Sequence, residues 1–322
     1  MRAITYDAYG GPDVLGLNEI EVPSPGDDEV LIKVRAASLN PYDWHFMRGK
    51  PYFMRAQAGL RRPKVSRFGA DVAGTVETAG GNVTDLRPGD EVFGQATGAL
   101  AEYVVAKPKG LAAKPDGVSF EQAATLNIAG LTALQGLRDK GNLQAGQQVL
   151  INGASGGVGT FAVQIAAHLG AEVTGVCSTR NLDLVRSLGA AHVVDYTSDD
   201  YATTDRRYDL ILDNVATRSP GRNRRILTPD GTYVAVGSAS MGDWIGPITF
   251  LAGVHLAGML RSQTMTSILA SINAADLTTL AEMVASGAVT PVIDRTYPLA
   301  ETAAALEYVE AGHVPGKVVV TP

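Results

Sequence analysis

A glycine-rich turn near the middle of the chain constrains the fold more than any other segment. It reads INGASGGVG at residues 151–159. The continuously apolar segment VLING (149–153) enters it, which predicts a buried strand, and residues 158–169 have the pattern of a helix. A glycine turn that joins a strand to a helix is typical of dinucleotide-binding βαβ units. We therefore expect a parallel-sheet domain around this turn.

The spacing of the turn assigns roles to its residues. Ala154 stands at the usual first glycine, Gly156 would let the backbone approach a pyrophosphate, and Gly159 would let the helix pack on the strand. The phosphates would lie at the helix N-terminus, where unpaired N–H groups and the helix dipole favour anions. The alternative is a purely structural turn. The predicted cofactor contacts are Ala154, Ser155, Gly156, Gly157 and Val158.

The end of the second predicted strand bears on which dinucleotide is bound. NAD-binding domains usually carry Asp or Glu there to hold the ribose 2′-hydroxyl. Here the strand ends in Ser178, Thr179 and Arg180, with no acid. Two hydroxyls and a guanidinium suit a 2′-phosphate, because Arg forms charge-assisted bonds with phosphate oxygens. We predict NADPH (NADP); in the alternative, Ser178 only caps the next helix and Arg180 is solvated.

The material on either side of this region has a different pattern. Short β-branched runs separated by Gly and Pro predict strands at residues 29–37, 70–79, 91–94 and 102–106. Ser119 is a candidate N-cap for a following helix. The closing run KVVV (317–320) could pair back with these strands, which would make the β-rich domain discontinuous.

Composition limits the class of protein. At roughly 150 residues per domain, 322 residues suggest two domains. The net charge of −6 gives no reason to expect nucleic-acid binding, and Cys177 as the one cysteine excludes an intrachain disulfide or a thiolate zinc cluster. No run approaches the ~20 apolar residues of a membrane span, and the N-terminus lacks a signal-peptide core. We expect a soluble, cytoplasmic protein that does not bind membranes.

Segments spread along the chain share a pattern with one group of enzymes. They are ASLNPYDW (37–44), GADVAG (69–74), RPGDEVFG (87–94), the glycine turn, CSTR (177–180), DNV (213–215) and GHVPGKVVV (312–320). In them the chain resembles the medium-chain dehydrogenase/reductase superfamily, and within it the zinc-independent quinone oxidoreductases and 2-alkenal reductases. The resemblance implies an α/β chain with a GroES-like β-rich catalytic domain (1–121 plus 266–322) and a Rossmann NADPH-binding domain (122–265), with the cofactor between them.

The chain departs from the zinc-dependent members of this superfamily. Leu39 and Asn40 stand near their catalytic cysteine, residues 69–71 read Gly-Ala-Asp at their His-Glu pair, and no cysteine run follows Gly98. We therefore predict no zinc. Alcohol oxidation would then lack its Lewis acid, whereas hydride transfer to a quinone or to the β-carbon of an enone needs only a positioned, already polarised acceptor.

The resemblance also implies catalytic residues. Asn40 would lie near the nicotinamide and bond the cofactor or the substrate oxygen; the alternative is an Asn-Pro turn residue. Tyr42 and His45 would be proton donors or pocket walls. Three further cofactor contacts are implied: Thr132 at the nicotinamide ribose or amide, Tyr196 at the adenosine end, and Lys317, which could equally flank the final strand.

Two predicted strand ends complete the cofactor contacts. Asn214 and Val215 follow one strand and Gly237 and Ser238 the next. Open α/β sheets bind ligands at the carboxyl ends of their strands, so we expect these residues to border the nicotinamide half.

The basic stretch, the oligomeric state and the substrate each allow more than one interpretation. A basic stretch at 47–68, with seven cations and no acid, could steer anions or be a solvated loop. A strand near Arg261 to Leu269 would pair across a two-fold axis in a homodimer. The leading function is reduction of a small-molecule quinone or activated alkene; the alternatives are an enoyl-thioester reductase and a non-catalytic, crystallin-like NADPH-binding protein.

Overall fold

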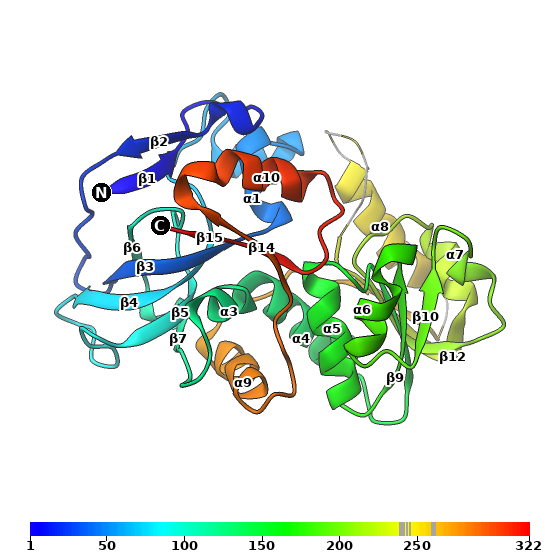
Figure 1. Cartoon of the computed structure of the whole chain (residues 1–322). Coiled ribbons are helices and arrows are strands. Elements are labelled where there is room, and N and C mark those ends of the chain that lie inside the picture. The colour runs from blue at the N-terminus through cyan, green and yellow to red at the C-terminus, as the bar shows by residue number, and fades with distance from the viewer. Residues whose placement is uncertain (238–241, 243, 245, 259–261) are drawn as a thin grey trace. The chain divides into compact units, whose positions relative to one another are not determined.

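The chain forms two compact units. The computed structural model describes residues 1–237, 242, 244, 246–258 and 262–322 (Figure 1). The terminal unit comprises Met1–Ala129, Ser271–Gly287 and Ile293–Pro322, and the central unit comprises Gly130–Ala270 and Ala288–Val292.

The first boundary lies after Ala129, later than the predicted residue 121, and the second after Ala270 instead of residue 265. The later first boundary has a packing cause: α3 (Phe120–Ala124) packs on strands β3 (Val30–Leu39) and β4 (Asp71–Ala79) of the terminal unit. Ser119 caps this helix as expected, accepting from the backbone N–H of Gln122 at 3.2 Å.

The terminal unit is built on a seven-stranded sheet. Its order is β14-β15-β3-β4-β5-β7, with β6 also paired to β3. The closing strand does pair back with the first half of the chain, since Val318 lies opposite Leu39 in antiparallel register. The strands are β3 (Val30–Leu39), β4 (Asp71–Ala79), β5 (Glu91–Gln95), β6 (Tyr103–Ala106), β7 (Leu111–Ala113), β14 (Ile293–Pro298) and β15 (Lys317–Thr321).

Helices and a separate hairpin surround this sheet. The hairpin pairs β1 (Arg2–Thr5) with β2 (Gly16–Glu19). Buried side chains such as Ile32, Val72, Val92, Leu306 and Val320 form the hydrophobic core. The remaining helices of the unit are α1 (Pro41–Arg48), α2 (Arg55–Ala58), α9 (Ala274–Ala285) and α10 (Thr302–Glu310).

In the described part of the central unit, six parallel strands form one sheet. They are β8 (Gln148–Asn152), β9 (Glu172–Cys177), β10 (His192–Asp195), β11 (Tyr208–Asp213), β12 (Leu227–Ala235) and β13 (Thr264–Ser267). The sheet order is β10-β9-β8-β11-β12-β13, which is 3-2-1-4-5-6 when the strands are counted from β8. This is the order of the Rossmann fold, and the reversal between β8 and β11 marks the switch point where such sheets bind ligands.

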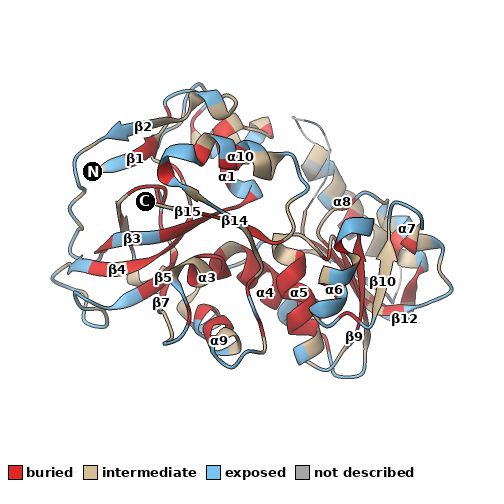
Figure 2. Ribbon diagram, in the orientation of Figure 1, coloured by how far each residue is buried: buried red, intermediate tan, exposed pale blue. Residues whose placement is uncertain are grey.

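Helices pack against this sheet, as the alternating sequence pattern predicts. They are α4 (Leu131–Gln135), α5 (Gly157–His168), α6 (Leu182–Ser187), α7 (Pro220–Arg225) and α8 (Gly246–Gly258). Figure 2 shows α5 largely buried, and its side chains from Gly159 to Ala166 are all shielded from solvent. No helix in the described ranges is long and apolar enough to cross a membrane.

Candidate functional site

The glycine turn between β8 and α5 has a shape that can hold a phosphate group. A Cβ on Gly159 would lie 2.0 Å from the carbonyl oxygen of Gly153, so only glycine allows the helix to approach the turn this closely. A Cβ on Gly156 would meet nothing nearer than 3.5 Å. No side chain caps the first turn of α5. The open face at Gly156 and the uncapped helix therefore fit an anionic ligand.

The end of β9 brings Ser178 next to the glycine turn. The side-chain amide of Asn181 donates to the hydroxyls of Ser155, at 3.0 Å, and of Ser178, at 3.3 Å. Two of the predicted cofactor contacts are thus joined through one residue that the sequence analysis missed. Arg180 is exposed at this end of the sheet.

Thr179 differs from its neighbour because its hydroxyl is directed to an acid. It donates to Asp195, at the end of β10, over 2.5 Å. This bond and those from Thr197 lower the pKa of Asp195, which stays a carboxylate. Cys177 is buried, which raises the pKa of its thiol to about 11 and makes it a packing residue, as its position at the strand end suggests.

A buried carboxylate organises the ends of β8 and β11. Asp213 accepts hydrogen bonds from the side chains of Asn152, at 2.8 Å, and Tyr233, at 2.9 Å, and from the backbone N–H of Ala216, at 2.7 Å. Asn214 donates to the carbonyl of Asn152 at 2.9 Å. The turn after β11 is therefore fixed by charge-assisted bonds.

Asn214 retains an unused acceptor in this turn. Its side-chain oxygen is buried and has no hydrogen-bond partner among the residues that the structure describes. Buried polar atoms are normally paired, so this oxygen fits a donor supplied by a ligand. Val215 packs against the glycine turn, since a Cβ on Gly153 would lie 2.7 Å from its Cγ2 atom.

The remaining predicted cofactor contacts of the central unit lie in separate segments of the chain: in α4, after β10 and after β12. Thr132 is buried in α4, whereas Tyr196 is half exposed and its N–H bonds the carbonyl of Cys177 at 3.1 Å. Gly237 lies against Asn214, whose carbonyl oxygen would be 2.6 Å from a Cβ placed there. Ser238 lies outside the described residues.

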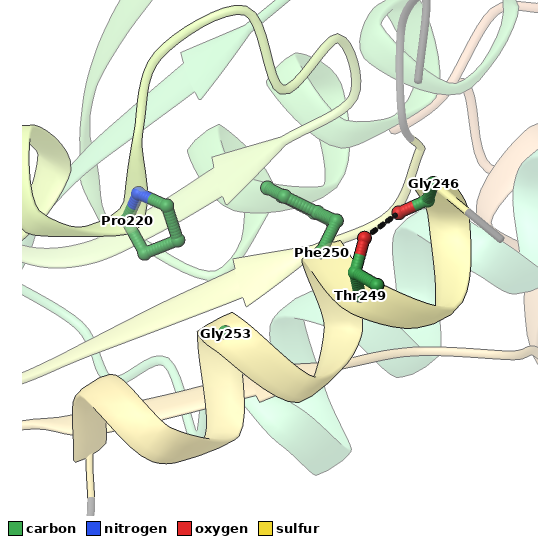
Figure 3. Close-up of a pocket in the computed structure, with 5 residues that line it drawn as sticks. All are labelled: Pro220, Gly246, Thr249, Phe250 and Gly253. Atoms are coloured by element: carbon green, nitrogen blue, oxygen red, sulfur yellow. Dashed lines mark hydrogen bonds between the residues drawn. The ribbon is translucent and has the colours of Figure 1, made fainter. Parts of the chain in front are cut away.

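A separate cavity of about 400 Å³ lies beside α7 and α8 (Figure 3). It contains none of the predicted site residues. Its lining residues are Pro220, Gly246, Thr249, Phe250 and Gly253.

The terminal unit holds a buried polar cluster at the end of β3. The ammonium group of Lys317 donates to the side-chain oxygen of Asn40 and to the carbonyl of Leu39, and lies 3.8 Å from a carboxylate oxygen of Asp71. The amide of Asn40 donates to the same oxygen of Asp71 at 2.8 Å. The cluster thus brings together two residues from the predicted site, Asn40 and Lys317, and an acid that was not predicted.

Asp71 and Asp43 complete this cluster. Asp71 also accepts from Ser38, at 2.8 Å, and from Asn127, at 2.9 Å. Asp43 accepts from the backbone N–H of Asn40 at 2.8 Å. Burial, with a contribution from the nearby Asp71 charge, raises the pKa of Asp43 to about 7, and burial lowers the pKa of Lys317.

Tyr42 and His45 both lie on α1, and they differ in whether the side chain has a proton available to donate to a ligand. Tyr42 is 44% exposed, and partial burial raises its pKa, so it stays protonated. His45 contacts the carbonyl of Lys50 through Nδ1 at 2.9 Å. A carbonyl only accepts, so Nδ1 carries the proton and Nε2 of the neutral ring is an acceptor. Burial lowers the pKa of His45 and favours this neutral form.

The basic stretch at 47–68 includes cations that have structural partners. Arg48 pairs with Glu310 of α10, and Arg55 stacks on the ring of Tyr9 with 4.4 Å to its centroid. Arg61 and Arg62 are exposed.

Known proteins match this chain over both units. The alcohol dehydrogenase GroES-like domain matches residues 26–116, and the zinc-binding dehydrogenase family matches residues 188–320. The two units are thus the GroES-like domain and the Rossmann domain of a dehydrogenase/reductase. The chain belongs to the medium-chain dehydrogenase/reductase superfamily, in its branch of quinone oxidoreductases and alkenal reductases.

Individual relatives resemble the whole chain. The NADPH-dependent alkenal/one oxidoreductase of Arabidopsis thaliana is 36% identical over all of this chain and 80% of its own length. A quinone oxidoreductase of Triphysaria versicolor is 34% identical over all of this chain and 98% of its own. The structure of the quinone oxidoreductase from Coxiella burnetii superposes with a TM-score of 0.89 at 30% identity, covering 100% of this chain and 99% of that one.

The cluster around Asp71 does not fit the zinc that the matching family name implies. Both carboxylate oxygens of Asp71 already accept hydrogen bonds, and the second carboxyl group of the cluster, Asp43, accepts from the backbone N–H of Asn40. The ammonium of Lys317 stands 3.8 Å from Asp71, where a second cation would be repelled. In the residues that the structure describes, no three His, Cys, Asp or Glu side chains are grouped to hold a metal ion.

Proposed function

We propose that this chain is an NADPH-dependent oxidoreductase that transfers hydride to a quinone or to the activated C=C bond of an α,β-unsaturated carbonyl compound, without zinc. The observation that carries the proposal is that Asn181 links Ser178, in the segment Ser178–Arg180 that follows β9 and contains no acid, to Ser155 of the open glycine turn. The names of the relatives, an NADPH-dependent alkenal/one oxidoreductase and a quinone oxidoreductase, support it.

The central unit would bind the cofactor, which supplies a hydride from its nicotinamide ring when bound. The N-terminus of α5 and Ser155 would hold the pyrophosphate, and Ser178 and Arg180 the 2′-phosphate. The unpaired oxygen of Asn214 would accept a hydrogen bond from the nicotinamide half. Asp213 would keep Asn214 and Val215 in place, because its five donors include the N–H groups of Val215 and Ala216.

The terminal unit would supply a proton. Hydride addition to the β-carbon of an enone leaves an enolate, and a proton must be delivered to complete the reduction. We infer that Tyr42 donates it, since its phenol retains its proton, whereas neutral His45 presents an acceptor at Nε2. Asn40 would act through its position at the start of α1, the helix that carries Tyr42. Its side-chain amide is already engaged, because the nitrogen donates to Asp71 and the oxygen accepts from Lys317.

Two further parts of the proposal concern assembly and location. We propose a homodimer in which β13 of two copies pairs, because β13 is the outer strand of the described sheet next to β12. Part of the predicted segment, including Arg261, lies outside the described residues. We also propose a cytoplasmic location, although the similar plant enzymes are named as chloroplastic.

An enoyl-thioester reductase is the second candidate. The enoyl reductase CurK has a solved structure that superposes with a TM-score of 0.84 at 27% identity, covering 99% of this chain and 98% of that one. This likeness favours conjugate reduction as a reaction type and leaves the acceptor to experiment.

The test is NADPH oxidation with EDTA present, against a quinone, 2-hexenal, methyl vinyl ketone and crotonyl-CoA, with NADH in parallel. We expect turnover that survives chelation, prefers NADPH and is faster with the quinone or the enones than with the thioester. Fastest turnover of crotonyl-CoA would favour the second candidate. Tight NADPH binding with no turnover would overturn the enzyme proposal and leave a non-catalytic binding protein.

A further inference from the structure

Asn181 joins the glycine turn to the end of β9. Asn181 as a whole residue is 8% exposed and lies in the turn between β9 and α6. The amide donates to Ser155 of the glycine turn at 3.0 Å and to Ser178 at 3.3 Å, and the backbone N–H donates to the carbonyl of Ser178 at 2.9 Å. One buried residue thus holds two hydroxyls that belong to different segments of the phosphate site.

The direction of these hydrogen bonds determines what the two hydroxyls can offer a ligand. A serine hydroxyl has one proton and two acceptor positions, and an Asn amide nitrogen has two protons. Each serine uses an acceptor position on Asn181, so its own proton points elsewhere. Hydrogen bonds in such a chain polarise one another, which makes each hydroxyl a better donor. Ser155 and Ser178 are therefore both set to donate, as an anion requires.

The hydroxyl of Thr179, the residue after Ser178, is directed to Asp195. Thr179 gives its proton to Asp195 at 2.5 Å, so it is committed to a carboxylate of the protein itself. Ser178 is thus the hydroxyl at the end of β9 that Asn181 prepares for an incoming phosphate.

We propose that Asn181 is a positioning residue that sets the preference for a 2′-phosphorylated dinucleotide, by holding Ser155 and Ser178 as donors. This inference rests on the proposed function, because it requires NADPH to bind at the glycine turn. Ser155 faces the pyrophosphate, which NADH also carries, whereas Ser178 faces the 2′-phosphate, which NADH lacks. Loss of Asn181 therefore weakens NADPH binding more than NADH binding.

The experiment compares dissociation constants for NADPH and NADH, measured by nucleotide fluorescence, in four single variants and one double variant. N181L removes the amide at similar volume. It is expected to weaken NADPH binding about tenfold more than NADH binding, which corresponds to the loss of one hydrogen bond to a charged group. N181D would draw both serine protons inward and add a negative charge, so it should weaken NADPH more than N181L does. N142D is the charge-matched control in the same unit, since an Asp there still accepts from Gln144.

S178A supplies a readout that a merely structural role would not move. Alone, S178A should weaken NADPH binding more than NADH binding. In the N181L background it should weaken NADPH binding little further, because the Ser178 hydroxyl is no longer oriented there. Equal weakening of NADPH and NADH in N181L, or an undiminished effect of S178A in the N181L background, would overturn the inference. Circular dichroism confirms folding, and 2′,5′-ADP and 5′-AMP as competitors repeat the comparison without nicotinamide. Wild-type protein that binds neither dinucleotide would instead refute the proposed function.

Discussion

The ammonium group of Lys317 lies 3.8 Å from the carboxylate of Asp71, and both side chains are almost completely buried, at 3% and 0% exposure. The two residues come from opposite halves of the chain and meet because β15 pairs with β3, which in turn pairs with β4. A buried pair of this kind is costly to break, because removal of one partner leaves the other charge without compensation.

Lys317→Met should therefore destabilise the protein strongly. The substitution keeps much of the volume but removes the cation beside the buried Asp71, which keeps its neutral hydrogen-bond donors, at an expected cost of about 3–5 kcal/mol in the free energy of unfolding. Urea denaturation measures it. Lys33→Met on β3 is the control, since Lys33 is exposed, and should change stability by about 0.5 kcal/mol or less. Equal effects of the two substitutions would mean that the buried pair has no special role.

Asp43 should make stability depend on pH. Its pKa in the folded protein is raised to about 7 from 3.8, so the folded state binds more protons than the unfolded state between these values. Its contribution therefore falls as pH rises from about 4 to 7. Asp43→Asn can still accept from Asn40 and removes the ionisation. Guanidinium denaturation at pH 5 and pH 8 measures the free energy of unfolding of both proteins, and the stability of the variant relative to wild type should be greater at pH 8 than at pH 5. The same difference at both pH values would contradict the raised pKa of Asp43.

Gly159→Ala should disrupt the glycine turn. A Cβ there would lie 2.0 Å from the carbonyl oxygen of Gly153, so α5 must move away from β8. We expect a loss of about 1–3 kcal/mol of stability together with loss of NADPH binding, measured by thermal unfolding with and without the nucleotide. Gly221→Ala is the matched control, because nothing lies within 4 Å of its Cβ position. Unchanged NADPH binding in the Gly159 variant would separate the turn from the cofactor.

Asp213→Asn tests the carboxylate that orders the end of β11. The new amide group would face donors from Asn152 and Tyr233, and the charge that strengthens these bonds would be lost. We expect about 2–4 kcal/mol of destabilisation and weaker NADPH binding, because the turn that carries Asn214 is held by this group. Asp205→Asn, at an exposed position, should leave both quantities unchanged.

Tyr42→Phe distinguishes a side-chain proton donor from solvent. If the phenol protonates the product, kcat with an enone should fall about 10²-fold while KM changes little, and the solvent isotope effect should change. His45→Gln should have a much smaller effect, because the neutral ring has no proton to give at Nε2. Wild-type rates in the Tyr42 variant would assign protonation to water.

The parts of the molecule that sequence patterns specify locally were predictable. The glycine turn, the strands around it and the cap at Ser119 each depend on residues close together in the chain. The cluster of Asn40, Asp71 and Lys317 depends on pairing between strands that are far apart in sequence, so no local pattern reveals it. Asn181 was missed for a different reason: an Asn before a helix reads as an ordinary cap, and its bond to Ser155 spans 26 positions.

The position of β15 inside its sheet has a consequence for synthesis of the protein. β15 lies between β14 and β3, and Lys317 follows Leu39 by 278 residues. β4 covers one edge of β3, and β6 pairs with the first part of the other edge, Val30–Lys33. While the chain is still emerging from a ribosome, the last part of that edge, Ala37–Leu39, must therefore wait for β15 until nearly the whole sequence has been made. The central unit, whose sheet is complete by Ser267, can close well before then. The end of β3 at Ala37–Leu39 is therefore the part of this strand whose pairing is completed last.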